Sequence, residues 1–350
     1  MVFGKKDHLV GLDIGSAFIK VAELKMSKKG NSLQKFGMAP VPSGVIEEGR
    51  IIDRDRLAEI IRTLFKSHKI RKKNVAISTG GHSVVVKTIS TPTVDDKELH
   101  KTIRAEAEQY IPYDIDDVNI DYQILGESEF SSEQMNVLLV AVKKDLVAEY
   151  MDLIQLAGLS PSIIDVDTFA LQNIFETLPG QNPEEVVLLV DVGASKTSLN
   201  ILKENSSMMM RDTMSGCNQI VEAVRDGLDT DFATAEQIVH GEKSPPGEPG
   251  IVEEICTSIA GGWCAEICEV VHSFHSSTNE TRVERIVLSG GGGFIESLTQ
   301  SLNAELNVPV SRIDPFGGLD VDPKRFGDLE PFKLQAPIAL GLALRRVDDK

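Results

Sequence analysis

The chain has 350 residues, 41% of them hydrophobic, which is longer than a typical single domain, so we expect two or more domains. Its formal net charge of −17 argues against a nucleic-acid partner, because proteins bind nucleic acid through clustered Lys and Arg. The sequence contains no secretory leader and no run of about 18 apolar residues, so it predicts a cytoplasmic protein without a membrane anchor of its own.

The first predicted element is a β-hairpin over residues 8–24. An apolar run, a turn at Gly15 and Ser16, and a second apolar stretch follow one another in this segment. Asp13 lies where the first strand enters the turn. A carboxylate beside glycine amides that can approach a ligand closely is typical of a site for a phosphate and its cation.

Residues 75–158 have a different character, because their pattern predicts strand, helix, strand, strand and helix. We interpret this segment as a small α+β subdomain inserted into the first half of the molecule. Its first helix is predicted over residues 95–110, with Tyr110 on the buried face. Its second helix is predicted over residues 145–158, and we expect both helices to pack on the small sheet.

The hairpin pattern returns at residues 187–202, where Asp191-Val192-Gly193 matches Asp13-Ile14-Gly15. A repeat over this distance indicates a duplicated architecture with two related halves. The predicted division assigns residues 1–74 and 159–185 to the first half, residues 186–229 and 281–350 to the second half, and residues 230–280 to a helical subdomain of the second half.

A third glycine cluster, at residues 290–293, follows an apolar strand and precedes a helix. Backbone without side chains can approach a base or a ribose closely at such a turn. Neither a Rossmann G-x-G-x-x-G motif nor a P-loop occurs in the chain, so a nucleotide would have to be held by the turns and this cluster. An irregular crossing over residues 305–335 and a final helix over residues 337–346 complete the predicted fold.

These three elements, in this order, resemble the two phosphate loops and the adenosine loop of the actin, sugar-kinase and heat-shock-chaperone superfamily. Residues 162–170 and 337–343 resemble the two connections between the halves of that superfamily. Within it, VGLDIGSAFIKVAEL at the start and AEAEQYIPYDIDDVNIDYQIL in the insertion resemble the PilM family of type IV pilus assembly proteins, which is similar to the cell-division protein FtsA. The resemblance implies an α/β, actin-like (ribonuclease H-like) fold that clasps ATP.

The predicted site follows from the residues and the resemblance together. Asp13 and Asp191 are expected to hold Mg²⁺ through waters, because that ion dehydrates reluctantly. Asp167, with Asp165 as second choice, matches the superfamily position that orients an attacking water, and we expect at most a weak ATPase. The predicted phosphate-binding residues are Asp13, Gly15, Ser16, Ala17, Lys20, Asp191, Gly193, Ala194, Ser195 and Thr197, and the predicted adenosine-binding residues are Gly216, Glu236, Gly290, Gly291 and Gly292.

Two positions depart from the superfamily pattern. Cys217 stands where a second glycine often opens a helix, and Val239 stands where a lysine often accompanies Glu236. The first departure puts the approach of a backbone amide to the phosphates in doubt, and the second removes a cation near the ribose.

The resemblance also implies a function, namely an ATP-binding scaffold of pilus assembly, and hence of twitching motility. Its partner would be the inner-membrane protein PilN, recruited through the N-terminal cytoplasmic peptide of PilN, and nucleotide state would bias this binding. Other inner-membrane pilus assembly proteins would be further partners, so the chain would reach the membrane only indirectly. A filament-forming protein of the FtsA type and a small-molecule kinase on the same fold remain open as alternatives.

Overall fold

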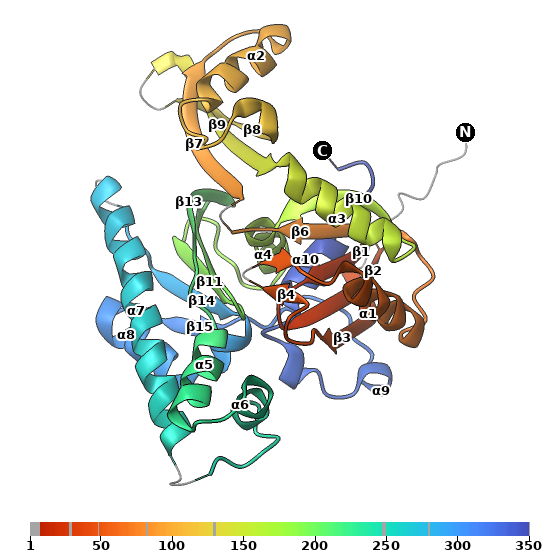
Figure 1. Ribbon diagram of the computed structural model, residues 1–350. Helices are drawn as coiled ribbons and strands as arrows, with labels where there is room; N and C mark the ends of the chain where they lie inside the picture. The colour runs from red at the N-terminus through yellow and green to blue at the C-terminus, as the bar shows by residue number, and fades with distance from the viewer. Residues whose placement is uncertain are drawn as a thin grey trace.

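The computed structural model describes residues 8–27, 30–47, 49–81, 83–128, 131–246, 250–278 and 281–349. Two lobes, each built around a five-stranded sheet, lie side by side, and a smaller unit projects from the first lobe (Figure 1). None of the helices in this described part of the chain is long and apolar enough to cross a bilayer.

The first half contains a sheet with the strand order β10-β6-β1-β2-β3. β6 runs parallel to β1, and β10 runs parallel to β6, so the carboxyl ends of these three strands lie at one edge of the sheet. Helices α1 and α3 provide the crossover connections that parallel strands require. The elements are β1 (Val10–Ile14), β2 (Phe18–Ser27), β3 (Gly30–Pro40), β4 (Ile46–Glu47), β5 (Arg50–Ile51), α1 (Arg54–Ser67), β6 (Asn74–Thr79), α3 (Lys144–Leu156) and β10 (Ser160–Val166).

The second half repeats this plan with the strand order β13-β12-β11-β14-β15. β11 pairs antiparallel with β12 and parallel with β14, as β1 does with β2 and β6. The predicted duplication is therefore confirmed. The strands are β11 (Val187–Val192), β12 (Thr197–Lys203), β13 (Ser206–Thr213), β14 (Arg285–Ser289) and β15 (Val310–Arg312).

The two hairpins have turns of equal length. Gly15 N donates to Phe18 O at 3.1 Å, and Gly193 N donates to Lys196 O at 2.9 Å. Lys196 therefore occupies the position of Phe18.

The same register matches Lys20 with Ser198, because these residues face Asp13 and Asp191 across their hairpins. Thr197, one of the predicted phosphate-binding residues, precedes this counterpart of Lys20 by one residue.

The projecting unit is a three-stranded sheet in the order β7-β9-β8, with α2 on one face. This unit spans residues 84–143, a shorter segment than the predicted insertion over residues 75–158. β6 belongs to the first sheet, and the apolar face of α3 packs into the core of the first half, because a crossover helix must cover the sheet that it connects. The elements of the unit are β7 (Val84–Pro92), α2 (Asp96–Ala107), η1 (Ile115–Asp117), β8 (Val118–Ser128) and β9 (Ser131–Lys143).

The prediction that Tyr110 lies on the buried face of the first inserted helix was also wrong. α2 ends at Ala107, and the Tyr110 side chain is 37% exposed. Its ring lies 4.2 Å from the Lys87 ammonium.

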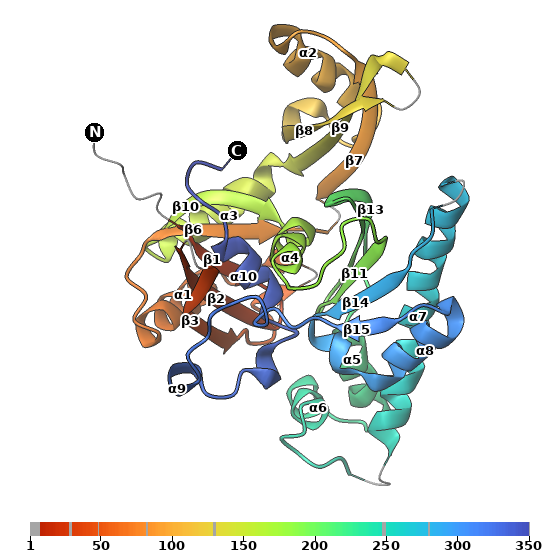
Figure 2. The same ribbon diagram turned by 180° about the vertical axis from the view of Figure 1, so that it is seen from behind.

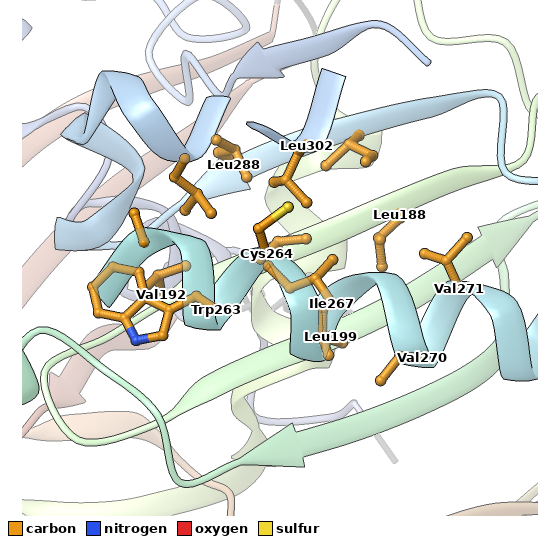
Figure 3. Packing of buried hydrophobic residues seen from close by; sticks show 14 of the residues in the cluster. Leu188, Val192, Leu199, Trp263, Cys264, Ile267, Val270, Val271, Leu288 and Leu302 are labelled. Atoms are coloured by element: carbon orange, nitrogen blue, oxygen red, sulfur yellow. The ribbon is translucent and has the colours of Figure 1, made fainter. Parts of the chain in front are cut away.

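Helices cover the sheet of the second half, and the buried side chains of α7 pack into the core of this half. Trp263, Cys264 and Ile267 of α7 pack against Leu188 and Leu199 of the sheet (Figure 3). The predicted helical subdomain over residues 230–280 therefore shares one core with the sheet. The helices of this half are α5 (Asn218–Gly227), α6 (Phe232–Val239), α7 (Ile251–Ser277), η2 (Gly291–Phe294) and α8 (Glu296–Leu306).

Two helices, α4 (Asp167–Glu176) and α10 (Pro337–Ala343), lie between the sheets (Figure 2). A Cβ added to Gly341 would lie 1.8 Å from Ala170 O, and one added to Gly11 would lie 2.0 Å from Ala339 O. Only glycine allows these backbones to come so close. The halves therefore share an apolar base under the cleft.

The segment before α10 contains more structure than its sequence predicts, since β15, α9 (Pro323–Phe326) and η3 (Glu330–Phe332) interrupt the expected irregular crossing.

Candidate functional site

A cleft of about 980 Å³ lies between the two halves. The ends of β1, β6, β11 and β14 open into it, because parallel strands place their carboxyl ends at one edge of each sheet. The first residue of α4, Asp167, and the start of α10 contribute to its wall. Ligand sites of the α/β class form at this edge of the sheet.

The two aspartate-glycine turns face each other across this cleft. Ser16 Oγ and Ser195 Oγ lie 2.9 Å apart, although they are 179 residues apart in sequence. The predicted site residues that line the cleft are Asp13, Gly15, Ser16, Ala17, Lys20, Asp167, Asp191, Gly193, Ala194, Ser195, Glu236, Gly290 and Gly291.

The charge on the first turn is neutralised within its own hairpin. Lys20 Nζ lies 3.0 Å from Asp13 Oδ2, and Asp13 is 6% exposed. Burial raises the pKa of Asp13, and the Lys20 ammonium opposes this rise.

The carboxylate on the second turn has a different environment. Burial raises the pKa of Asp191 to about 6, because a charge is costly in an apolar surrounding. Among the residues that the structure describes, Asp191 forms no ion pair. A divalent cation between the turns would offset this cost, so the donor set fits Mg²⁺.

Lys196 is a cleft residue that the sequence pattern did not reveal. Its Nζ lies 2.6 Å from Asp167 Oδ2, in the first half, and 3.7 Å from Asp212 Oδ2, in its own half. Burial disfavours the charge on Lys196, yet these two carboxylates raise the pKa of the ammonium. Burial likewise disfavours the Asp167 carboxylate, and Lys196 lowers the pKa of this group below its usual value. Aligning the two hairpin turns would have indicated Lys196, because it replaces the apolar Phe18 there.

Four predicted site residues lie outside the cleft wall. The buried Thr197 hydroxyl donates to Ser215 O at 2.8 Å, so it is committed to the protein. Asp165 accepts from Arg345 Nε at 2.7 Å and is 5% exposed, because the chain after α10 passes beside the end of β10. Neither side chain is available for the predicted role.

Gly216 and Gly292 serve the packing of loops. A Cβ on Gly216 would lie 2.6 Å from Ala194 O, and one on Gly292 would lie 2.3 Å from Val192 Cγ1. These glycines permit close approach between loops, whereas the prediction assigned them to adenosine.

The other end of the cleft is less charged. Glu236 and Val239 of α6 line it together with Gly290 and Gly291. Gly290 has a φ of 79°, and its added Cβ would lie 2.3 Å from Val192 O, so glycine is required there. Cys217 also lies in this wall, and burial raises the pKa of its thiol to about 12, so the thiol stays protonated and is a poor nucleophile.

No cluster of three or more metal-ligating side chains occurs within the described ranges. The cleft therefore offers a cation two carboxylates rather than a closed cage. Mg²⁺ is typically bound by one or two carboxylates together with waters and substrate phosphates.

Comparisons with known proteins show a family and a fold. A family model described as type IV pilus assembly protein PilM matches residues 11–347. The chain is 27% identical to a solved structure titled PilM-PilN type IV pilus biogenesis complex, with a TM-score of 0.88, over 99% of this chain and 100% of that chain.

Two more distant structures share the fold. The ethanolamine utilization protein EutJ from Carboxydothermus hydrogenoformans is 14% identical, with a TM-score of 0.56 over 97% of this chain and 90% of that one. A diol dehydratase-reactivating factor in nucleotide free form is 10% identical, with a TM-score of 0.52 over 96% of this chain and 99% of that one. The fold is actin-like, as the duplicated halves predict.

Proposed function

Because the chain belongs to the type IV pilus assembly protein PilM family, we propose that it is a nucleotide-dependent scaffold of type IV pilus assembly. The observation that carries this proposal is the pair of aspartate-glycine turns joined across one cleft by Ser16 and Ser195. A volume of about 980 Å³ accommodates a nucleotide, since small-molecule sites occupy roughly 300–1,000 Å³.

In this proposal the turns hold the phosphates of ATP. The amides of Gly15 and Gly193 close their own turns, so the residues that follow them, Ser16 and Ala17 in one turn and Ala194 and Ser195 in the other, would surround the phosphates, and Lys20 adds a positive charge. Asp13 and Asp191 would hold Mg²⁺ through its waters. When bound, that ion supplies positive charge between the carboxylates and the phosphates.

The adenosine would lie at the less charged end of the cleft. Gly290 and Gly291 allow the backbone to approach it closely, and Glu236 can accept hydrogen bonds from the ribose hydroxyls.

We expect slow ATP hydrolysis at most. Asp167 is the candidate for orienting a water, because it lies in the cleft wall at the first residue of α4. Its carboxylate accepts a short hydrogen bond from Lys196, so it is not free to bind a water at the same oxygen. A scaffold needs a nucleotide-dependent shape and no rapid turnover.

The proposed partner is the N-terminal cytoplasmic peptide of PilN, docked beside the small sheet. The support is the 27% identity and the TM-score of 0.88 to a protein solved in a PilM-PilN complex. A three-stranded open sheet has two edges, β7 and β8, and an extended peptide can pair with such an edge. Binding to PilN would also bring the chain to the inner membrane.

The structure suggests how the nucleotide could influence this partner. β6 ends at Thr79 beside the cleft, and Gly80 and Gly81 lead from there towards β7. Gly81 N donates to Asp212 on the opposite half. A change in the distance between the halves would therefore act directly on the strand that begins the small sheet.

The test is calorimetric titration of a synthetic PilN N-terminal peptide into the full chain, with and without Mg-ATP. We expect binding in both conditions and an affinity that differs by roughly 5-fold or more, which is the lower end of typical allosteric coupling. A scrambled peptide is the control. In Asp191→Ala the peptide should still bind, with the same affinity in both conditions. Absence of binding would contradict the partner, and equal affinities in the wild type would contradict the nucleotide dependence.

A further inference from the structure

Lys196 has no role in the nucleotide site described so far, although it is among the most heavily engaged side chains of the cleft. Its ammonium lies between Asp167 of the first half and Asp212 of the second. The Lys196 side chain is 24% exposed and that of Asp167 is 15% exposed. Charged groups in such positions are costly unless they are paired, so the pair holds the two halves together at this point.

The loop after β6 is shaped to accommodate this pair. A Cβ added to Gly80 would lie 2.1 Å from Lys196 Nζ and 2.7 Å from Asp167 Oδ2. Gly80 has no positive φ, so the obstacle to a side chain there is the ends of the Lys196 and Asp167 side chains rather than the backbone. The pair therefore packs directly on the chain that leads to the small sheet.

Polar contacts between described residues cross the cleft around Lys196. They are the Lys196–Asp167 ion pair, the Ser16–Ser195 hydrogen bond and the Gly81–Asp212 hydrogen bond. The base of the cleft, in contrast, is an apolar cluster shared by both halves. Polar contacts exchange partners with ligands more readily than a packed core rearranges. A ligand can therefore change the distance between the halves at these three polar contacts rather than at the apolar base.

Lys196 is also the basic group whose partner lies on the other half. Four Lys and Arg side chains belong to the described cleft wall. Lys20 pairs with Asp13 inside its own hairpin, Lys143 lies over the Tyr113 ring at 4.0 Å, and Arg50 is exposed on β5. Lys196 alone among these four joins the halves by an ion pair.

We propose that Lys196 distinguishes a nucleoside triphosphate from a diphosphate by exchanging its partner across the cleft, from Asp167 to the terminal phosphate. The inference rests on the proposed function, because it requires a nucleotide between the turns. Lys196 lies in the second turn, two residues beyond Ala194, where the last phosphate of a bound chain would meet it. The terminal phosphate would bring negative charge close to Asp13, Asp167 and Asp191. It therefore competes with Asp167 for the Lys196 ammonium.

The exchange has a consequence for the first half. Once Lys196 binds the phosphate, Asp167 loses its cation, and the Gly80 loop loses the pair that packs on it. The loop is then held to the second half by the Gly81–Asp212 hydrogen bond without the ion pair. A diphosphate leaves the Lys196–Asp167 pair in place, so the two nucleotides give different distances between the halves.

The first test measures the affinities for ATP and ADP, each with Mg²⁺, by calorimetry. Lys196→Met should weaken ATP binding about 10-fold and ADP binding less than about 2-fold, since a charge-assisted contact of 1.4 kcal/mol corresponds to a factor of ten. Asp167→Asn should strengthen ATP binding several-fold, because the competitor for the ammonium is gone. In the double variant this gain should vanish. Lys72→Met, which removes a lysine paired with Glu23 outside the cleft wall, is the control.

The outcomes separate this inference from the function on which it rests. If the wild type binds neither nucleotide, the proposed function fails, and the inference fails with it. If the wild type binds both but Lys196→Met weakens them equally, or if the effects of Lys196→Met and Asp167→Asn simply add, the nucleotide site stands and the exchange of partners is overturned.

A second test needs no nucleotide. Gly80→Ala keeps both charged groups but adds a methyl group where the Lys196 ammonium and the Asp167 carboxylate now meet, so the pair must shift and the midpoint of thermal unfolding should fall. In the Gly80→Ala background, Lys196→Met should have a much smaller effect on this midpoint than in the wild type. Gly317→Ala is the matched control, because Gly317 also lies outside helices and strands, has no positive φ, and its added Cβ would make only ordinary contacts at 3.5 Å or more. Equal effects of Lys196→Met in both backgrounds would show that the pair does not hold the halves together.

Discussion

The two hairpins that wall the cleft share their backbone but differ in whether a lysine pairs with their aspartate. Asp13 pairs with Lys20 of its own hairpin, whereas Ser198 stands in the matching position opposite Asp191. The lysine of the second hairpin, Lys196, lies in the turn and reaches across to the first half. Duplication has thus kept the carboxylates and the turns, while the lysine of the first hairpin pairs within its own hairpin and the lysine of the second pairs with the other half.

The strands that lead into these turns differ as well. Gly11 and Leu189 each precede their aspartate by two residues. α10 lies directly against β1 at Gly11, whereas Leu189 fills the shared core on the other side. The base of the cleft is therefore asymmetric, and α10 is closely attached to the first half.

Among the substitutions that test this comparison, Gly11→Ala should lower the free energy of unfolding the most. The added methyl group meets Ala339 O and Ala343 N, which are backbone atoms and cannot rotate away. We expect a loss of about 3 kcal/mol or more in the free energy of unfolding, at the upper end for overpacking, measured by urea denaturation. A variant that unfolds at the wild-type midpoint would show that α10 can shift away from β1.

At the matching position in the second half, a smaller side chain, rather than a larger one, should destabilise the fold. Leu189→Ala removes carbons from a packed core and should cost about 2–5 kcal/mol.

Asp191→Asn should stabilise the chain when nucleotide and Mg²⁺ are absent. The folded pKa of Asp191 is about 6, above its ordinary value of 3.8, so the folded state binds more protons between these values. Stability therefore falls as pH rises from about 4 to about 6, and the cost persists at higher pH. The asparagine variant should exceed the wild type by up to about 3 kcal/mol at pH 7.5, at 1.36 kcal/mol per pKa unit.

This difference should fall below about 1 kcal/mol near pH 4, where Asp191 is protonated in the folded state and about half protonated in the unfolded state. Thermal unfolding in EDTA at pH 4 and pH 7.5 measures it. A wild-type protein at least as stable as Asp191→Asn at pH 7.5 would show that the buried carboxylate is already neutralised by other groups.

The smallest expected effect concerns the direct link between the turns. Ser16→Ala removes one half-buried hydrogen bond and should cost about 1 kcal/mol. Ser195→Ala and the double variant should cost the same, because all three lose a single interaction. Additive losses would mean that the two hydroxyls have separate partners, and Ser276→Ala on the exposed surface of α7 serves as the control.

Much of the architecture follows from local pattern. The hairpins, the repeat and the glycine cluster appear as apolar runs that end in Asp and Gly, and these features place the cleft between two halves. Apolar periodicity also predicts α3, but not the core in which Tyr150 and Ile154 pack, because periodicity marks the buried face and not the neighbour that covers it.

The errors at the site have a different cause. Arg345 pairs with Asp165 over 180 residues, and Lys196 pairs with Asp167 between halves, and no local pattern encodes such contacts. The mistaken choice of Thr197, in contrast, was avoidable. Lys20 and Ser198 each follow their aspartate by seven residues, so counting along the repeat identifies the correct counterpart.

Calorimetric titration of Mg-ATP into the wild type, Asp13→Ala and Asp191→Ala tests most directly whether one ligand is held by both turns. Each substitution, although 178 residues separate the two positions, should weaken binding by about 100-fold or more, equal to about 2.7 kcal/mol, while circular dichroism stays unchanged. Wild-type affinity in either variant would contradict a site shared between the halves.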